Sequence, residues 1–251
     1  MSISIKSEKE IELMREAGRI LANVLEELVA MVRPGISTLD IDKKCAEIIK
    51  GYQCIPSFLN YNGYPASVCT SVNGEVVHGI PNKNRILREG DIVSLDCGVI
   101  YQGFHSDAAR TVAVGEISKE ARKLIEVTEQ SFYEGIKFAR EGHHLHEISE
   151  AIQTYVEAHG YSVVRDLVGH GIGRNLHEEP QIPNFKQKRR GPKLEAGMTL
   201  AIEPMVNVGR YDVYWEDDDW TVVTADGSLS AHYENTVLIT GGDPDLLTLK
   251  K

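Results

Sequence analysis

The chain repeats itself at an offset of 107 positions, and this repeat restricts the fold more than any other feature of the sequence. The segment LREGDIVSLD, which ends at Asp96, aligns with LEAGMTLAIE, which ends at Glu203 (203 − 96 = 107). The same offset carries Gly35 to Gly142. Matches at one offset in two separate places indicate two structurally similar halves that are built from the same elements in the same order.

Each half begins with helical periodicity and continues with strand-like sequence. Apolar residues recur every three or four positions in 7–32 and 38–49, and again in 119–140 and 146–159, which predicts two helices per half. Ser7 and Glu10 match a capping box, and Thr38 is expected to cap the second helix. Segments 66–78 and 91–114 are rich in Val, Ile and Thr and predict strands, as do the stretches after Tyr161.

These patterns predict an α/β (α+β) fold with two pseudo-symmetric ααββ halves, residues 7–115 and 118–240. The halves are expected to share one antiparallel sheet, with the helices covering a face of it. No linker rich in Pro, Gly or Ser separates them, so residues 1–251 are expected to form a single domain.

Charge and cysteine usage exclude several classes of protein. The formal charge is 27 − 37 = −10, which argues against non-specific binding to nucleic acid or to an anionic membrane, because affinity for phosphate groups comes mainly from clustered Lys and Arg. No specific DNA partner and no membrane contact are expected. The four cysteines form no C-x-x-C pair and are expected to be free thiols. Residues 1–10 are polar and do not resemble a secretory signal, so a cytoplasmic location is expected.

A hairpin is predicted to bring two carboxylates together in the first half. Asp96 and Asp107 stand on either side of a turn around residues 101–103, and antiparallel partners keep a constant sum of residue numbers (96 + 107 = 203). The turn would then be centred between Tyr101 and Gln102, and the two carboxylates would face each other with Cβ atoms roughly 5 Å apart. Two like charges at that distance need a cation.

The repeat supplies a second acidic pair. Glu203 corresponds to Asp96, and Glu234 lies where the counterpart of Asp107 is expected. Taken singly, each acidic residue is more often a solvent-exposed charge. The repeat instead favours four carboxylates that converge in otherwise apolar runs, where burial is costly without neutralisation, and two divalent ions would balance them.

One histidine completes this candidate site. His170 stands in the motif GHGIG, whose glycines are expected to let a loop turn tightly and to leave one imidazole projecting from it. A site rich in oxygen ligands with one imidazole suits Mn, Fe or Co, and Zn less obviously.

The chain resembles the type I methionine aminopeptidases of bacteria over almost its whole length. Five segments carry the resemblance in the family's order: VCTSVNGEVVHGIP, SLDCGVIYQGFHSDAARTVAVG, GHGIGRNLHEEP, GMTLAIEPMV and WTVVTADGSLSAHYENTVLIT. The resemblance implies the pita-bread fold, with a curved sheet and helices on its outer face. It also implies removal of the initiator methionine from nascent polypeptides with a small second residue, by attack of metal-bound hydroxide on the first peptide bond.

The resemblance also assigns roles to individual residues. It implies a dinuclear centre held by Asp96, Asp107, His170, Glu203 and Glu234. His78, His177 and Glu203 would be catalytic, with His177 donating to the oxyanion and Glu203 carrying the proton of the attacking water. The methionine pocket would be built by Phe58, Tyr61, Tyr64, Cys69, His78, Leu176, His177 and Trp220. Leu176 departs from the family, because that position is commonly aromatic. Asn73, Glu75 and Ser230 would hold one monovalent cation, Na or K.

Two other functions stay open. A proline-specific dipeptidase of the same fold would share the five ligands, although His78 and the compact length favour methionine removal. An inactive binding module of this fold typically lacks metal ligands, and here none is missing.

Three polar motifs are expected at the surface. They are GHHLHE (142–147) at a helix start, the hairpin loop WEDDDW (215–220) and KQKRR (186–190), for which transient ribosome contact is the functional alternative. The chain is expected to act as a monomer on polypeptide N-termini.

Overall fold

The computed structural model describes residues 3–250. Within that range the helices are α1 (Glu8–Met31), α2 (Thr38–Gly51), the short 3-10 helix η1 (Tyr61–Gly63), α3 (Lys119–Ile136) and α4 (Leu145–Ala158). Two helices therefore open each half, as the repeat predicts. No helix in the described part of the chain is both long enough and apolar enough to cross a bilayer.

Capping residues set where the first two helices begin. Ser7 precedes α1, and its backbone N–H donates to the carboxylate of Glu10, as predicted. The prediction that Thr38 caps α2 is wrong, because Ser37 has the extended backbone of a cap and its hydroxyl accepts from the N–H of Asp40. The hydroxyl of Thr38 instead donates to the carbonyl of Asn82.

The strands of the described residues pair only antiparallel and fall into four hydrogen-bonded groups. These groups have the orders β1-β4-β2 with β5 on β4, β13-β10-β6, β11-β12-β3 and β15-β14-β9-β7-β8. The strands are β1 (Ile55–Pro56), β2 (Val68–Val72), β3 (Glu75–Val77), β4 (Ile92–Tyr101), β5 (Phe104–Ala113), β6 (Ser162–Val163), β7 (Gly169–Gly171), β8 (Glu178–Ile182), β9 (Thr199–Ile202), β10 (Met205–Asn207), β11 (Val213–Trp215), β12 (Val222–Thr224), β13 (Ser230–His232), β14 (Asn235–Leu238) and β15 (Asp245–Leu246).

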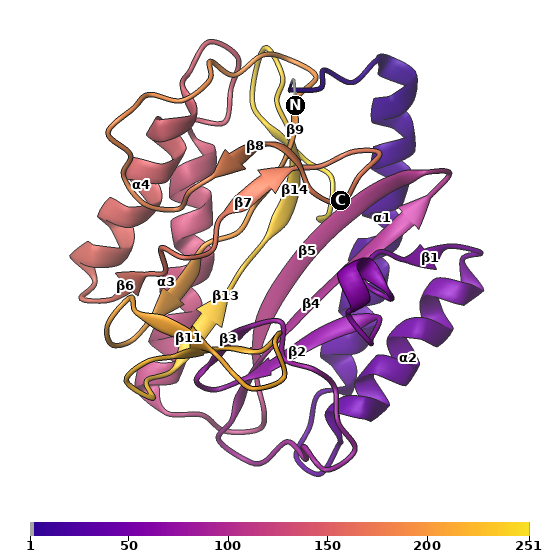
Figure 1. Cartoon of the computed structure of the whole chain (residues 1–251), viewed down its shortest axis with the longest axis vertical. Coiled ribbons are helices and arrows are strands. Elements are labelled where there is room, and N and C mark those ends of the chain that lie inside the picture. Colours follow the sequence, from indigo (N-terminus) through magenta and orange to yellow (C-terminus); the bar gives the residue numbers. More distant parts are fainter. Residues whose placement is uncertain (1–2, 251) are drawn as a thin grey trace.

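The two halves meet along β5 and β14. The backbone N–H groups of Ala109 and Glu234 each donate to the carbonyl of the other, at 3.3 and 3.0 Å. Figure 1 shows α1 and α2 together on one side of this seam and α3 and α4 on the other. The predicted α/β class with two related halves is therefore confirmed.

Each half has its own apolar core, and residues 107 positions apart occupy equivalent places in the two cores. Val93 and Leu95 of β4 are fully buried in the core under α1 and α2. Their counterparts Leu200 and Ile202 of β9, 107 positions later, are fully buried under α3 and α4. Because strand side chains alternate, Asp96 points to the face opposite Leu95, away from the helices.

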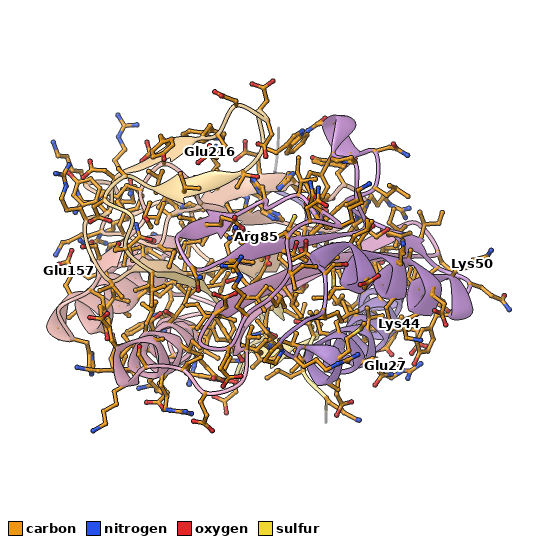
Figure 2. The ribbon with its side chains drawn as sticks, turned by 90° about the horizontal axis from the view of Figure 1, so that it is seen from below. Glu27, Lys44, Lys50, Arg85, Glu157 and Glu216 are labelled. Atoms are coloured by element: carbon orange, nitrogen blue, oxygen red, sulfur yellow. The ribbon has the colours of Figure 1, made fainter. Side chains whose placement is uncertain are left out.

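The helices cover one face of the strands. Figure 2 shows Glu27 and Lys44 at the helical bottom of the molecule, whereas Glu216 lies at the top, beyond the strands. Glu216 belongs to the exposed loop between β11 and β12, which confirms the predicted hairpin loop at 215–220. The helix-free face is the one on which the predicted carboxylates lie.

The predicted register of the first hairpin is wrong by two residues. In the β4–β5 ladder Asp96 pairs with Ala109 and Asp107 pairs with Gly98, so the constant sum is 205 (96 + 109). The turn is centred on Gln102 and Gly103, whose φ values of 47° and 82° belong to the two-residue turns that suit hairpins. Asp96 and Asp107 are consequently diagonal neighbours on one face, not directly opposed.

The second half has a different arrangement. Ile202 pairs with Asn235, and Met205 pairs with His232, so the same sum of 437 places Glu203 opposite Glu234 (203 + 234). Glu234 is therefore the counterpart of Ala109 and not, as predicted, of Asp107. The four carboxylates do not form a symmetric set.

Candidate metal centre and substrate cavity

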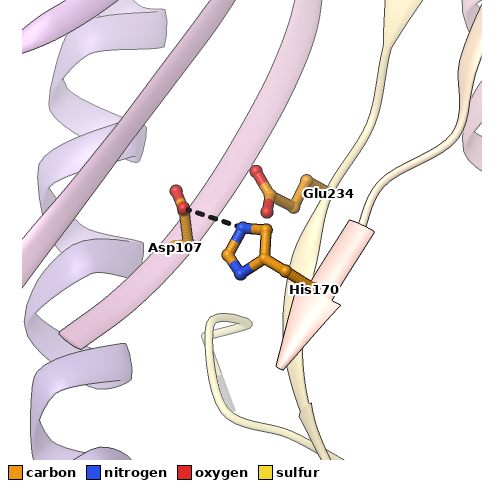
Figure 3. A group of neighbouring side chains, drawn as sticks. All are labelled: Asp107, His170 and Glu234. Carbon is orange, nitrogen blue, oxygen red and sulfur yellow. Dashed lines mark ion pairs between the residues drawn. The ribbon is translucent and has the colours of Figure 1, made fainter. Parts of the chain in front are cut away.

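Five predicted ligands come from both halves of the chain. Asp96 lies on β4, Asp107 on β5 and His170 on β7, whereas Glu203 directly follows β9 and Glu234 directly precedes β14. Figure 3 shows Asp107, His170 and Glu234 pointing toward one another from three separate segments. A ligand atom of each of these three lies within 4.8 Å of the others.

The remaining two carboxylates adjoin this trio. The Nε2 atom of His170 lies 3.8 Å from Oδ2 of Asp107 and 3.6 Å from Oε1 of Glu203. Asp96 is the diagonal neighbour of Asp107 on one face of the β4–β5 ladder. All five side chains line one cavity of about 190 Å³.

Burial makes this cluster expensive to ionise. Desolvation raises the pKa of Asp96 to about 7. It also raises the pKa values of Asp107, Glu203 and Glu234 well above their ordinary values, and neighbouring carboxylates raise them further. Burial lowers the pKa of His170 to about 3, so its imidazole is neutral at pH 7 and has a lone pair for a metal ion.

The donor set fits divalent cations. Oδ1 of Asp96, Oδ1 of Asp107 and Oε1 of Glu234 are buried and have no hydrogen-bond partner among residues 3–250. Buried carboxylate oxygens normally have such partners, and three oxygens without one in a single cluster are suited to binding cations. Four carboxylates with one neutral imidazole match the preferences of oxygen-seeking divalent metals.

His170 lies on a strand, which corrects the prediction of a loop. β7 pairs with β8 on one side and with β9 on the other, and the flanking glycines permit this close packing. A Cβ at Gly169 would lie 2.4 Å from the carbonyl oxygen of Ala201, and one at Gly171 would lie 2.2 Å from that of Glu179. These glycines are needed for close backbone approach rather than for a tight turn.

The predicted methionine pocket adjoins the carboxylates in the same cavity. Its lining includes all eight predicted side chains, namely Phe58, Tyr61, Tyr64, Cys69, His78, Leu176, His177 and Trp220. The ring of Trp220 meets those of Tyr64 and His78 edge-on, at 5.0 and 6.2 Å between centroids. Burial raises the pKa of the Cys69 thiol, so this wall stays uncharged. Leu176 is buried in the same apolar cluster as Phe58, Tyr64 and Cys69.

Two histidines without a ligand assignment stand at the boundary between pocket and carboxylates. His78 has a φ of 60°, a strained value for a non-glycine residue that is common at functional sites. The ring of His177 lies 4.2 Å from that of His170, and its Nδ1 is 2.7 Å from the hydroxyl of Tyr61. Burial lowers the pKa of His177 and lowers that of His78 to about 4, so both are neutral at pH 7.

The sequence-based account missed His232. This side chain is buried on β13, and its Nε2 lies 3.7 Å from Oε2 of Glu203. Strand alternation could have found it, because residues 232 and 234 share a face of an extended chain. The apolar cavity residues Val77, Leu167 and Met205 were also missed, since nothing distinguishes them from ordinary core residues.

The residues predicted for a monovalent cation have other partners. The side chain of Asn73 bonds to Asp91 and to the N–H of Ile92. Glu75 pairs with Arg85 at 2.9 Å, and the hydroxyl of Ser230 donates to Val206.

The other predicted polar motifs lie away from the cavity. His144 directly precedes α4, and Nδ1 of His143 contacts Glu147 at 2.8 Å, so GHHLHE lies at a helix start as predicted. Lys186 pairs with Glu150 on α4, within a mostly exposed segment that includes 186–190. The four cysteines are free thiols, as predicted.

Comparison with known proteins identifies close relatives. The profile of Metallopeptidase family M24 matches residues 12–241. A methionine aminopeptidase of Clostridium acetobutylicum is 57% identical over 247 residues, which cover 98% of this chain and 99% of the relative. The crystal structure of a methionine aminopeptidase from Thermotoga maritima superimposes with a TM-score of 0.97 at 45% identity, covering 99% of this chain and 100% of that one.

More distant structures share only the fold. The prolidase of Pyrococcus horikoshii superimposes with a TM-score of 0.80 at 22% identity, covering 98% of this chain and 64% of the prolidase. The ligand set alone left open a methionine aminopeptidase and a proline-specific dipeptidase. The sequence similarity favours the methionine aminopeptidase.

Proposed function

The chain belongs to metallopeptidase family M24, among the type I methionine aminopeptidases of bacteria, and from this premise we propose that it removes the initiator methionine from nascent polypeptides. One observation carries the proposal: a single cavity combines the five predicted metal ligands with an apolar pocket lined by aromatic rings. A cavity of this kind suits a peptide whose first side chain enters the pocket and whose first peptide bond lies at the carboxylates.

We propose that Asp96, Asp107, His170, Glu203 and Glu234 hold two divalent ions, with Mn, Fe or Co favoured over Zn. The four buried carboxylates with raised pKa values and the orphaned oxygens support this assignment. When bound, such ions polarise a carbonyl and lower the pKa of water, so that hydroxide is available near neutral pH. Because the ligands come from both halves, residues 1–251 would act as one catalytic domain.

His177 is proposed to stabilise the charge that develops on the scissile carbonyl oxygen. Burial raises the pKa of Tyr61, so its hydroxyl keeps its proton and can donate to Nδ1 of His177. The neutral imidazole then carries its hydrogen on Nε2, where it is free to donate toward the substrate. Glu203 is proposed to carry the proton of the attacking water, and His78 to orient the peptide nitrogen.

The pocket is proposed to select methionine by the shape of its wall and by the polarisability of the groups that form it. Tyr64 and Trp220 present ring edges, and Cys69 adds a buried sulfur, so the wall suits an unbranched thioether. The hydroxyl of Tyr64 is engaged with the carbonyls of Val68 and Gly79, and its ring forms part of the cavity wall. A small residue is expected at the second position of the substrate, since the cavity is only about 190 Å³.

The proposal also covers the location and oligomeric state of the enzyme, a ribosome contact and a monovalent cation site. Nascent polypeptides as substrates, with four free thiols in the enzyme, support a cytoplasmic location, and we propose that the enzyme acts as a monomer. The exposed basic residues of 186–190 are proposed to contact the ribosome transiently. The backbone bond from Ser230 to the carbonyl of Asn73 brings these two segments together and supports carbonyl coordination of a monovalent ion near Glu75.

A side-by-side assay tests the proposed function. Purified protein is treated with chelator, reloaded with Mn²⁺ and given Met-Ala-Ser, Met-Leu-Ser and Ala-Pro peptides. We expect cleavage of Met-Ala-Ser only in the reloaded sample, with little cleavage of the other two. Cleavage of Ala-Pro in preference to Met-Ala-Ser, or equal activity without metal, would overturn the proposal.

A further inference from the structure

His232 is a buried imidazole whose ring nitrogens have no hydrogen-bond partner among residues 3–250. Its exposed fraction is 1%, and neither Nδ1 nor Nε2 makes a hydrogen bond to any residue in the described part of the chain. A buried polar group without a hydrogen bond costs about 1–3 kcal/mol, so such a side chain calls for a physical reason.

The two carboxylate oxygens of Glu203 face two different imidazoles. Oε1 lies 3.6 Å from Nε2 of His170, and Oε2 lies 3.7 Å from Nε2 of His232. An N–H···O hydrogen bond is usually about 2.9 Å long, so a movement of less than ~1 Å would form one at Oε2. One oxygen of Glu203 is therefore directed to the candidate ions and the other to His232.

The backbone around His232 is fixed from the neighbouring half. Its N–H donates to Oγ1 of Thr111, and the hydroxyl of Thr111 donates to its carbonyl oxygen, both at 2.8 Å. The same hydroxyl bonds to Ser94 at 2.7 Å. His232 is consequently presented to Glu203 on a rigid strand, which suits a positioning role.

We propose that His232 is a positioning residue for the metal centre, donating its Nε2 hydrogen to Oε2 of Glu203 when Glu203 binds an ion through Oε1. The inference rests on the proposed function, since it needs Glu203 to be a ligand. Hydrogen bonds to ligating carboxylates fix their orientation, and loss of such a partner typically weakens metal binding by about 10- to 100-fold. His232 does not line the methionine pocket, so it acts on the ligand and not on the substrate.

Metal affinity measured without substrate tests this role. Metal-free wild type, His232→Leu and His232→Gln are titrated with Mn²⁺ by isothermal titration calorimetry, after circular dichroism has verified that each variant is folded. Leu has a similar volume but no donor, whereas the amide of Gln keeps an N–H at about the same reach. We expect the Leu variant to bind Mn²⁺ about 10- to 100-fold more weakly and the Gln variant to stay within about threefold of wild type.

Two results would overturn the role of His232. The first is equal Mn²⁺ affinity in wild type and the Leu variant. The second is an equal loss in the Leu and Gln variants, which would mean that the imidazole itself binds the ion. Kinetics at saturating Mn²⁺ supply a second readout, because KM for Met-Ala-Ser is expected to stay unchanged in both variants. Failure of wild type itself to bind Mn²⁺ or to cleave Met-Ala-Ser would instead reject the proposed function.

Discussion

Replacing Tyr61 with Phe removes one hydroxyl group from the substrate cavity and tests how His177 is oriented. That hydroxyl lies 2.7 Å from Nδ1 of His177, and the ring of Tyr61 remains in the cavity wall after the change. A neutral hydrogen bond contributes about 0.5–1.5 kcal/mol net, which corresponds to a fall in kcat of about 2- to 13-fold if the bond serves the transition state. KM is expected to change little.

A double-mutant cycle provides the decisive assay. Tyr61→Phe, His177→Ala and the double variant are compared on Met-Ala-Ser at saturating Mn²⁺. His177→Ala is expected to lower kcat by about 100-fold, as for the loss of one oxyanion donor. If Tyr61 acts through His177, the double variant is no slower than His177→Ala alone. An additional fall in the double variant, equal to that of Tyr61→Phe in wild type, would refute the reasoning. Tyr64→Phe is the matched control, because the hydroxyl of Tyr64 donates to the carbonyls of Val68 and Gly79 and not to His177, and this change should be additive with His177→Ala.

Three further predictions concern stability. Mn²⁺ at 100 times its Kd should raise the free energy of unfolding by about 2.7 kcal/mol per ion. The unfolding entropy of a chain of this length is ~0.5 kcal/mol/K, so Tm should rise by roughly 5 °C per ion. An unchanged Tm in scanning calorimetry would contradict this. The pKa of Asp96 is raised to about 7, so the folded metal-free protein binds more protons than the unfolded chain, and this part of its stability is lost as pH rises from about 4 through 7. Asp96→Asn should make the measured slope shallower in urea titrations with chelator without abolishing it, because Asp107, Glu203 and Glu234 also have raised pKa values; an identical slope would argue against it. Gly171→Ala, which places a Cβ 2.2 Å from the carbonyl oxygen of Glu179, should lower the free energy of unfolding by about 1–3 kcal/mol or more. Gly51→Ala is the control, because its Cβ meets nothing within 4 Å, and its effect should be near neutral. Equal effects of the two changes in urea unfolding would count against the packing argument.

The repeat made the architecture predictable from sequence. Periodicity located the four helices, and the offset of 107 paired Leu95 with Ile202 in equivalent core positions. The five candidate ligands and the eight pocket residues were also predicted, and the structure gathers them around one cavity. The repeat and the apolar runs pointed to the acidic residues, whereas the pocket residues were implied only by the resemblance to the type I methionine aminopeptidases, because no periodicity distinguishes a pocket wall from a core.

Details that depend on backbone geometry were not predictable. The hairpin register depended on which two residues adopt positive φ, and these are Gln102 and Gly103 rather than Tyr101 and Gln102. The glycines around His170 serve close strand packing, which no sequence pattern distinguishes from a tight turn. Strand alternation could place His232 on the same face as Glu234, but its contact with Glu203 joins two strands and could not be read from the sequence.

The most direct test of the account is anomalous diffraction from a crystal of the protein grown with excess Mn²⁺. The account predicts two Mn²⁺ ions, coordinated jointly by Asp96, Asp107, His170, Glu203 and Glu234. Anomalous peaks elsewhere, or only solvent between these five side chains, would contradict it.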